Sequence, residues 1–474
     1  MPRSICVHPD HRSTVALSLE RNGFLTQSIL AGHLELALST VNNFCRGIRV
    51  SVAKFEEICE ALGLDQRVII QPQARTEDIS DPGAAGESSL EHFFAYDPFW
   101  VGREALTAEL ITKLKTSCRL MLITGMAGVG KTALAERVSV DLQGDATRLL
   151  RENFDDQEKS ADFASGAARL LEYCGQIVIP EERTDPQLLA RRLVLHLQET
   201  PYLILIDSLE QILKGNEQDG WSEFKDNGFE AFFKTVLASE TFQSRFILTS
   251  QELPAQIVKI GSRYQNFWHC QPLVGLSEAE QQALFVKTGF SPESSPELLR
   301  IGKAYEGHPL ALRIIIGEIG SHLFYGNIAA YWQRYSHEIE AVEKAIAEAA
   351  EGKTMGADDK WQLDRFTRAL RRNVQQRLEQ TFDRLRQDAK YAYILLCESS
   401  VYRCPVPDDW WLSHLEDWQR SEAEQMAALD ILCDRYLVEE MTESTQVLLK
   451  QHNLIRSVSL AHLKQLTFDV ITDS

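Results

Sequence analysis

The sequence contains no long apolar run and no closely paired cysteines. None of its apolar stretches approaches the ~20 residues that a membrane-spanning helix needs, and Met1–Asn22 carries His, Asp and Arg where a signal peptide has an apolar core. The nine cysteines are scattered without a Cys-x-x-Cys pair, which argues against a disulfide framework and against a zinc site. We therefore expect a reduced, cytoplasmic protein without a membrane helix.

Basic charge is also scarce. Lys and Arg number 49 against 68 Asp and Glu, which gives a formal net charge of −19. Because contacts to phosphate need a basic surface, this balance excludes a chain that coats nucleic acid non-specifically. The acidity is uneven, since residues 1–72 hold seven basic and seven acidic side chains. The N-terminal region is therefore neutral.

Sequence repeats with a period of 20–50 residues are absent, so we expect neither a solenoid nor a propeller within these 474 residues. A chain of this length is too long for one hydrophobic core. Helical periodicity, a polar stretch and a run of alternating strands and helices divide it. The expected regions are 1–72 (helical domain), 73–95 (linker), 96–272 (α/β domain), 273–390 (helical domain) and 391–474 (C-terminal domain).

Residues 120–132 carry the most informative motif. An apolar strand, Leu120–Ile123, leads into a loop that fits G-x-x-x-x-G-K-[ST] and opens a helix. Glycines let backbone N–H groups turn toward phosphate oxygens, and the helix N-terminus adds a partial positive charge. Lys131 is expected to reach the β- and γ-phosphates, and the Thr132 hydroxyl to bind Mg²⁺. A tight strand–helix turn would explain the glycines but not Lys131 and Thr132. We therefore predict a P-loop α/β domain that binds a nucleoside triphosphate or diphosphate. Its predicted phosphate-binding residues are Gly125, Gly128, Val129, Gly130, Lys131, Thr132 and Ala133.

A second strand ending in an acid is the partner that such a loop needs for Mg²⁺. The apolar strand Tyr202–Ile206 is followed by Asp207. Asp207 therefore lies at the C-terminal end of the strand, where parallel sheets bind their ligands. We predict Asp207 as a catalytic and metal-binding residue. Glu210, three residues later, is the nearest candidate for orienting the attacking water. A carboxylate favoured by a helix N-terminus explains Glu210 equally well.

A third apolar strand, Phe246–Leu248, ends in the polar residues Thr249-Ser250-Gln251, which could sense the γ-phosphate. No arginine occurs at this position. Because an arginine at a phosphoryl transition state is worth several kcal/mol, we expect slow turnover, a weak ATPase at most.

These residues, together with three more segments, resemble NB-ARC domains, the nucleotide switches of the STAND class of signalling ATPases. Phe99-Trp100-Val101-Gly102-Arg103-Glu104 is similar to the segment that opens the domain. Gly307-His308-Pro309-Leu310-Ala311 looks like the family's Gly-x-Pro motif. Gln451-His452-Asn453 falls where the family's Met-His-Asp motif closes a winged helix.

The resemblance implies roles and a cycle. Val101 and Gly102, with Arg103 beside them, would border adenine, Pro309 would pack on the base, and His452 would contact the β-phosphate of ADP. A compact ADP-bound state would exchange ADP for ATP and Mg²⁺ and open into an oligomer, with slow hydrolysis as the reset. A nucleotide that touches two domains can shift such an equilibrium if its affinity differs between the two states.

This chain departs from the family pattern at three places. Ser208 stands where a second acid commonly follows Asp207, Gln251 replaces a frequent arginine, and Gln451 and Asn453 flank His452. These departures favour nucleotide binding over turnover.

The N-terminal region is similar to a Cro/repressor-type helix-turn-helix. A helix begins at Thr26 and ends near Leu34, and a second helix, capped by Ser39, ends at Gly47. Apolar residues are expected to form its core (Ile29, Leu30, Leu38, Val41 and Phe44). Polar residues of the second helix are expected to face outward and reach DNA bases or phosphates (Ser39, Thr40, Asn42, Asn43 and Arg46).

Two functions of this N-terminal domain stay open. Only Arg46 and Arg49 lie near the second helix, and small helical domains on STAND proteins also recruit protein partners. Weak DNA binding by one copy would be strengthened by self-association, since linked copies gain avidity. The first hypothesis is thus a nucleotide-controlled DNA-binding regulator, and the second is an interaction scaffold.

The remaining sequence predicts mostly helices, and Ser277-x-x-Glu280 indicates a capping box that opens one of them. Apolar residues from Leu363 to Leu385 recur every three or four positions, which indicates one long amphipathic helix. Its arginines are expected to form a solvated face (Arg368, Arg371, Arg372, Arg377 and Arg384). Helices and two β runs, Tyr436–Val438 and Val447–Leu449, indicate a C-terminal winged helix. The sequence ends soon afterwards, and we expect no sensor repeats in it.

Overall fold

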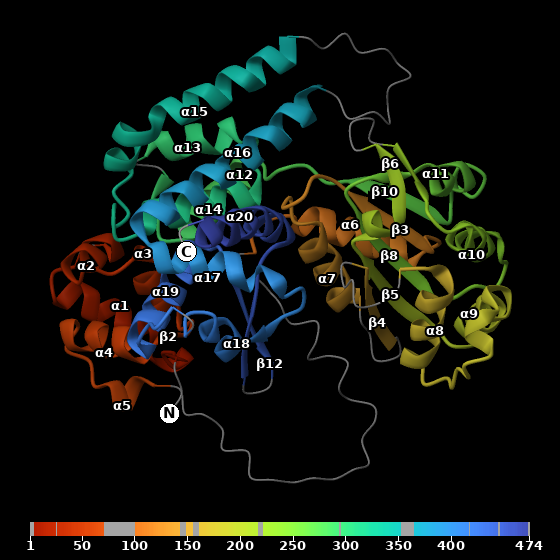
Figure 1. Cartoon of the computed structure of the whole chain (residues 1–474), viewed down its shortest axis with the longest axis horizontal. Coiled ribbons are helices and arrows are strands. Elements are labelled where there is room, and N and C mark those ends of the chain that lie inside the picture. Colours follow the sequence, from red (N-terminus) through yellow and green to blue (C-terminus); the bar gives the residue numbers. More distant parts are fainter. Residues whose placement is uncertain are drawn as a thin grey trace.

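The computed structural model describes residues 4–24, 26–70, 100–142, 148–154, 161–216, 221–292, 295–351, 365–416, 418–443 and 446–472. The predicted linker 73–95 and Phe99 lie outside these residues. In Figure 1 the parallel sheet and its flanking helices lie at the right, and the N-terminal helices lie at the left. The C-terminal segment lies between them. No helix in these ranges is both long and apolar enough to cross a membrane.

The N-terminal region is a small helical bundle with one short two-stranded sheet. Thr26 caps α2 through a hydrogen bond from the Ile29 N–H, and Gly47 ends α3 at φ 69°, as the sequence predicted. Its elements are β1(Ser4–Ile5), η1(Pro9–His11), α1(Arg12–Arg21), α2(Gln27–His33), α3(Leu38–Arg46), β2(Val50–Ser51), α4(Val52–Ala61) and α5(Gln66–Ile69).

Two predictions for this bundle are wrong. Ser39 does not cap α3, because the helix already starts at Leu38. The Ser39 hydroxyl donates instead to Asp434, far along the chain. Ile29 is 48% exposed, whereas the other four predicted core residues are buried. A helical period cannot distinguish the edge of an apolar stripe from its centre.

Five parallel strands form the central sheet in the order β10-β3-β8-β5-β4. The three strands expected from apolar runs are confirmed as β3, β5 and β8. The sheet strands are β3(Leu120–Thr124), β4(Arg148–Asn153), β5(Tyr202–Asp207), β8(Arg245–Ser250) and β10(Trp268–Pro272). Because β8 lies between β3 and β5, the loops that follow these three strands meet at one edge of the sheet.

Helices cover both faces of this sheet. A phenylalanine-rich core lies on one face beneath α8(Phe163–Tyr173), α9(Pro186–Glu199) and α10(Asn227–Ala238). The opposite face packs against α6(Glu104–Lys115) and α7(Lys131–Leu142). A smaller sheet that the sequence did not predict joins β6(Leu213–Asn216), β7(Trp221–Phe224) and β9(Leu253–Pro254). The short helix η4(Leu209–Ile212) precedes β6, and α11(Ala255–Gly261) follows β9.

Five helices follow the central sheet. The predicted capping box of Ser277 and Glu280 opens the first, and the predicted long amphipathic helix is α16. These helices are α12(Glu278–Lys287), α13(Pro296–Ala304), α14(Pro309–Gly320), α15(Ile328–Glu351) and α16(Arg365–Asp388). One hydrophobic core joins them to the N-terminal bundle, so the two helical regions pack as one body.

The arginine face of α16 is only partly solvated, so that prediction needs correction. Arg368 and Arg372 are exposed, but the side chain of Arg377 is completely buried and pairs with Glu318 and Glu338. Arg384 joins the same two carboxylates. The charges of Arg377 and Arg384 are compensated in the interior, because each arginine pairs with one acid on α14 and one on α15.

The C-terminal segment combines helices with an antiparallel sheet of order β11-β13-β12. The second predicted β run lies inside β13, but β12 begins at Glu439 and not at Tyr436. Tyr436 has φ 56° and Leu437 is fully buried, so this apolar run forms the turn after α19. The elements are α17(Lys390–Glu398), η6(Ser399–Val401), β11(Val406–Pro407), α18(Asp408–Ser413), α19(Glu422–Asp434), β12(Glu439–Glu443), β13(Gln446–Lys450) and α20(Asn453–Thr472).

Candidate functional site

The strand, loop and helix around Lys131 have the P-loop arrangement. The loop leaves β3 and enters α7 at Lys131, and Gly128 and Gly130 have φ of 78° and 94°, which favour glycine. Lys131 Nζ donates to the carbonyls of Gly125 at 3.0 Å and Met126 at 2.9 Å. Burial lowers the pKa of Lys131, with Glu210 and Asp207 opposing that effect. The amine is thus a buried donor at the place where phosphate oxygens would lie.

This loop forms one wall of a cavity of about 1230 Å³. Six of the seven predicted loop residues line it (Gly128, Val129, Gly130, Lys131, Thr132 and Ala133). Gly125 does not line it and serves instead as an acceptor for Lys131. The remaining walls come from the N-terminal bundle, the segment before α6, helices α12 and α14, the ends of β4, β5 and β8, and the C-terminal segment. The cavity therefore lies between parts of the chain that are more than 300 residues apart.

Thr132 and Asp207 lie together, as predicted. Thr132 Oγ1 donates to Asp207 Oδ1 at 3.0 Å, and the Thr249 hydroxyl donates to the same oxygen. A carboxylate and a hydroxyl beside a phosphate loop are the hard oxygen ligands that Mg²⁺ takes together with nucleotide phosphates. These residues fit a magnesium ion, which Thr132 and Asp207 would hold and which would supply positive charge beside the phosphates.

Arg151 on β4 is a residue that sequence reasoning missed. Its guanidinium lies 2.6 Å from Glu136 Oε1 and 3.7 Å from Asp207 Oδ2. Burial raises the pKa of Glu136 to about 7, although Arg151 opposes the shift. The pairing of Asn153 with Asp207 in the sheet register brings β4 to this site. No motif marks Arg151, so only a known strand order could have identified it.

Glu210 also lines the cavity, but its carboxylate is held by Gln251. The Gln251 backbone N–H donates to Glu210 Oε2 at 3.2 Å, and its side-chain amide donates to Oε1 at 2.8 Å. Burial raises the pKa of Glu210, with Lys131 opposing the shift. Gln251 thus holds the candidate catalytic carboxylate in place.

Apolar side chains also line the cavity, among them Trp100, Val101, Leu276, Leu284 and Pro309. Side chains of this kind suit a flat aromatic ring, whereas Lys131 suits charged phosphates. Val101 and Pro309, which the sequence analysis predicts as base contacts, both belong to this lining.

Gly102 and Arg103 lie between Val101 and the start of α6. Both have positive φ, 63° and 64°, and a Cβ on Gly102 would lie 2.3 Å from Glu280 Cγ. The Arg103 N–H donates to Glu280 Oε1 at 2.7 Å, and its guanidinium donates to the Val129 and Val274 carbonyls. Arg103 therefore connects the phosphate loop to the chain that leads into α12. Gly102 itself does not line the cavity.

His308 of the Gly-x-Pro segment contacts the phosphate loop directly. Its Nε2 lies 2.9 Å from the Ala127 carbonyl, and its Nδ1 accepts from the Ala311 N–H at 3.3 Å. Burial lowers its pKa to about 4. The imidazole is therefore neutral, with its proton on Nε2, and it holds the start of α14 against the loop.

We expect His308 to make stability fall with acidification. Its folded pKa lies below the unfolded value of about 6.5, so unfolded chains bind the proton first. The contribution is complete above pH 6.5 and is lost as the pH falls toward 4, by ~2 kcal/mol at pH 5. Urea unfolding of the wild type and His308→Gln at pH 7.5 and 5 measures it. Equal pH slopes for the two proteins would show that His308 is not the responsible group.

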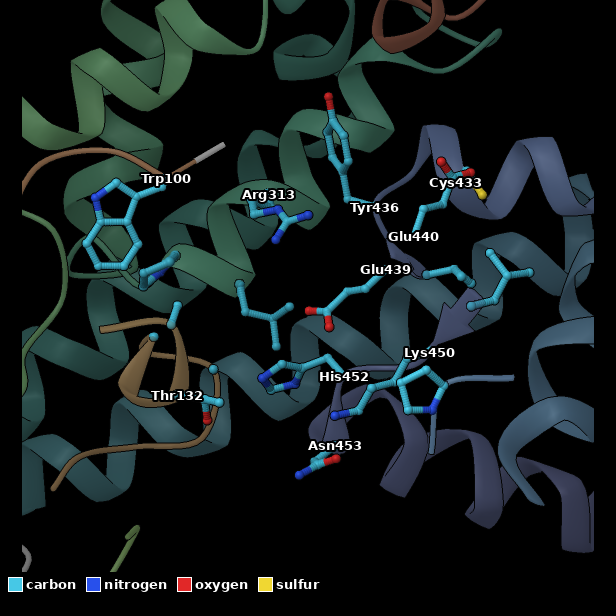
Figure 2. Close-up of a pocket in the computed structure, with 18 of the residues that line it drawn as sticks. Trp100, Thr132, Arg313, Cys433, Tyr436, Glu439, Glu440, Lys450, His452 and Asn453 are labelled. Atoms are coloured by element: carbon cyan, nitrogen blue, oxygen red, sulfur yellow. The ribbon is translucent and has the colours of Figure 1, made fainter. Parts of the chain in front are cut away.

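His452 approaches the cavity from the C-terminal segment. Its Nδ1 accepts from the Leu454 N–H at 3.2 Å, and burial, aided by Lys450 and Lys131, lowers its pKa to about 3. A neutral ring with Nδ1 occupied as acceptor carries its proton on Nε2. Figure 2 shows the ring pointing toward the side where Thr132 lies, with Lys450 beside it. His452 also precedes α20, whose N-terminus adds a partial positive charge.

The five predicted DNA-binding residues do not face outward. Ser39, Thr40 and Asn42 are each 3% exposed, and Asn43 and Arg46 are half-buried. Ser39 and Thr40 bond to Asp434, and Asn42 and Arg46 bond to the Lys287 carbonyl. The prediction of an outward face is wrong for this conformation because α3 packs against α12 and α19.

Comparison with known proteins gives distant matches. No protein family model matches the chain. An uncharacterized WD repeat-containing protein of Nostoc sp. (strain PCC 7120 / SAG 25.82 / UTEX 2576) is 25% identical over 331 residues, or 66% of this chain. The match covers 25% of that protein, so the chain spans about a quarter of its length.

Two solved structures are similar at low scores. One is a Signal Transduction ATPase with Numerous Domains (STAND) protein with a tetratricopeptide repeat sensor from Pyrococcus horikoshii. It has 14% identity and a TM-score of 0.42, covering 76% of this chain and 42% of that one. The Orc1 protein of Aeropyrum pernix in complex with DNA has 13% identity and a TM-score of 0.32, covering 77% and 93%.

Proposed function

We propose that this chain is an ATP/ADP-binding switch of the STAND type. The observation that carries the proposal is the single cavity lined by the phosphate loop, Pro309 of α14 and His452 of the C-terminal segment. A nucleotide bound there contacts all three parts. Its exchange shifts their arrangement to the extent that ADP and ATP differ in affinity for the two arrangements.

The residues divide by position in this cavity. Trp100, Val101 and Pro309 face the base, and Lys131 and the loop N–H groups hold the phosphates. Thr132 and Asp207 hold Mg²⁺, which supplies charge neutralisation at the phosphates. The neutral His452 donates from Nε2 to the β-phosphate. Lys450 and Arg313 also line the cavity and add positive charge that the sequence did not reveal.

Hydrolysis is the slow reset of this switch. Glu210 is the candidate for orienting water, and it is held by Gln251. Arg151 is bound to Glu136 and Asp207 and must move before it can contact a phosphate. A measured turnover of several per second would contradict a switch and would favour an ATPase that does mechanical work.

The output we propose is DNA binding by the N-terminal helices. The turn between α2 and α3 and the donors on α3 suit a helix-turn-helix, and the C-terminal helices and antiparallel sheet suit a winged helix. Self-association in the ATP state would join several weak DNA-binding copies. The second candidate is an interaction scaffold, supported by the neutral charge of residues 1–72. Arg46→Ala with Asn42→Ala distinguishes them: loss of DNA retention with an intact fold supports the regulator, whereas no DNA binding in either nucleotide state favours the scaffold.

We expect His452→Ala to release ADP roughly ten-fold faster. A hydrogen bond to a charged group contributes ~1.5–3 kcal/mol, and the alanine variant lacks it. Stopped-flow displacement of fluorescent ADP measures the rate. His452→Gln, which keeps a donor, should recover part of the retention. If ADP leaves the alanine variant at the wild-type rate, His452 does not contact the nucleotide.

Nucleotide identity tests the proposed function. Mass spectrometry of the material released by denaturing the purified chain should show adenosine diphosphate or triphosphate. Calorimetry on the emptied protein should then show binding of ADP at one site per chain. A chain that carries no nucleotide and binds neither ADP nor ATP at millimolar concentration is not a switch of this kind.

A further inference from the structure

We propose that two carboxylates of α19, Asp430 and Asp434, stand in for DNA phosphate against α3 in this closed form. DNA and α19 then compete for one surface, and the chain binds DNA only after α19 has moved away. The inference rests on the proposed DNA-binding function and specifies how that site is regulated.

The first turns of α3 supply hydroxyl donors to one carboxylate. Ser39 Oγ donates to Asp434 Oδ1 at 2.8 Å, and Thr40 Oγ1 donates to the same oxygen at 2.7 Å. Hydroxyl groups and helix N-termini are among the groups that bind DNA phosphates. An anionic oxygen already occupies this place, and it comes from the chain itself.

Lys54 of α4 completes the anion site. Its Nζ lies 3.3 Å from Asp434 Oδ2 and 3.2 Å from Asp430 Oδ2. All three side chains are largely buried, so water screens the interaction only partly. Two hydroxyls and one ammonium around a carboxylate pair match the donor set that a phosphate would require.

The base-reading side of α3 is covered as well. Asn42 Nδ2 and Arg46 Nη1 each donate to the Lys287 carbonyl at the end of α12, both at 3.1 Å. Asn and Arg are the side chains that most often form paired hydrogen bonds with adenine and guanine. Gly326 also packs closely on the start of α3, because a Cβ on it would lie 2.8 Å from Leu38 Cδ2.

The same segment connects this contact to the nucleotide cavity. Asp434 is the last residue of α19, and the chain continues through β12 and β13 to His452. Thr40, Asn43 and Lys54 line the cavity that also contains Lys131 and His452. A movement of the C-terminal segment away from the phosphate loop would therefore withdraw Asp434 from α3.

The test uses the full chain with ADP and a fluorescein-labelled 30-base-pair duplex in low salt. We expect Asp430→Asn with Asp434→Asn to bind the duplex at least ten-fold more tightly by fluorescence anisotropy. The matched control is Glu416→Gln with Glu422→Gln, which removes the same charge from two exposed positions and should leave affinity unchanged. Adding Arg46→Ala to the first pair should abolish the gain.

Hydrogen exchange of residues 38–46 separates this inference from the proposed function. Faster exchange in the Asp430/Asp434 variant, with unchanged melting of the rest of the chain, shows that the two acids hold α3. If exchange rises and DNA still does not bind, the contact is confirmed and DNA binding is wrong. If neither exchange nor affinity differs from the control pair, the inference is overturned. Equal, tight DNA binding by the wild type would also overturn it.

Discussion

Lys131→Met is expected to abolish nucleotide binding, with ADP affinity falling roughly a hundred-fold or more. Its ammonium is a buried charge in the loop where we propose that the phosphates bind, and hydrogen bonds between charged partners are the strong ones. The amine donates to two loop carbonyls at 2.9–3.0 Å, which hold it within the loop. Methionine keeps most of the length of the side chain and removes the ammonium, with its charge and its hydrogen-bond donors. Calorimetric titration with ADP measures the loss.

Lys115→Met is the matched control, because Lys115 is exposed at the end of α6 and does not line the cavity. It should leave ADP affinity unchanged. Thermal unfolding of both variants checks that the loop substitution has not unfolded the sheet domain. A Lys131 variant that folds and binds ADP as tightly as the wild type would show that this loop does not hold phosphate.

Arg377→Ala is expected to cost ~3–5 kcal/mol in the free energy of unfolding. The substitution leaves Glu318 buried beside Thr381 with only part of its positive partner charge, supplied by Arg384. Arg377 and Arg384 together hold the pKa of Glu318 below its ordinary value despite burial, so the carboxylate is charged. An unpaired buried charge is far more costly than an unpaired surface charge. Urea unfolding at pH 7.5 measures the difference.

Arg372→Ala on the same helix is the control, since that side chain is exposed and should change stability by less than ~0.5 kcal/mol. A second variant, Arg377→Met with Glu318→Met, removes both charges and should be less destabilised than Arg377→Ala alone. Equal destabilisation by Arg372→Ala and Arg377→Ala would contradict the importance of this buried network.

Local motifs predicted the part of the site that lies close in sequence. The phosphate loop, the strand ending in Asp207 and the capping box at Ser277 each depend on spacing within a few residues. Their positions follow from strand and helix geometry once the sheet is parallel. The proximity of Thr132 and Asp207 was predictable for this reason.

Residues brought together by the strand order and by domain packing were not predictable. Arg151 reaches Asp207 only because β4 pairs with β5, and no spacing rule encodes that neighbour. Polar residues on an amphipathic helix face either solvent or another domain, and composition alone cannot distinguish the two. This ambiguity explains why Ser39 and Thr40 were expected outside, and why Arg377 was expected in solvent.

The size of the chain with each nucleotide tests the central claim most directly. Small-angle scattering with light scattering should give a compact monomer with ADP. With a non-hydrolysable ATP analogue and Mg²⁺ it should give a larger radius or an assembly. Lys131→Met should show neither response. Identical dimensions with ADP and with the ATP analogue, at concentrations that saturate the site, would contradict an account in which one nucleotide joins the sheet domain to the C-terminal segment.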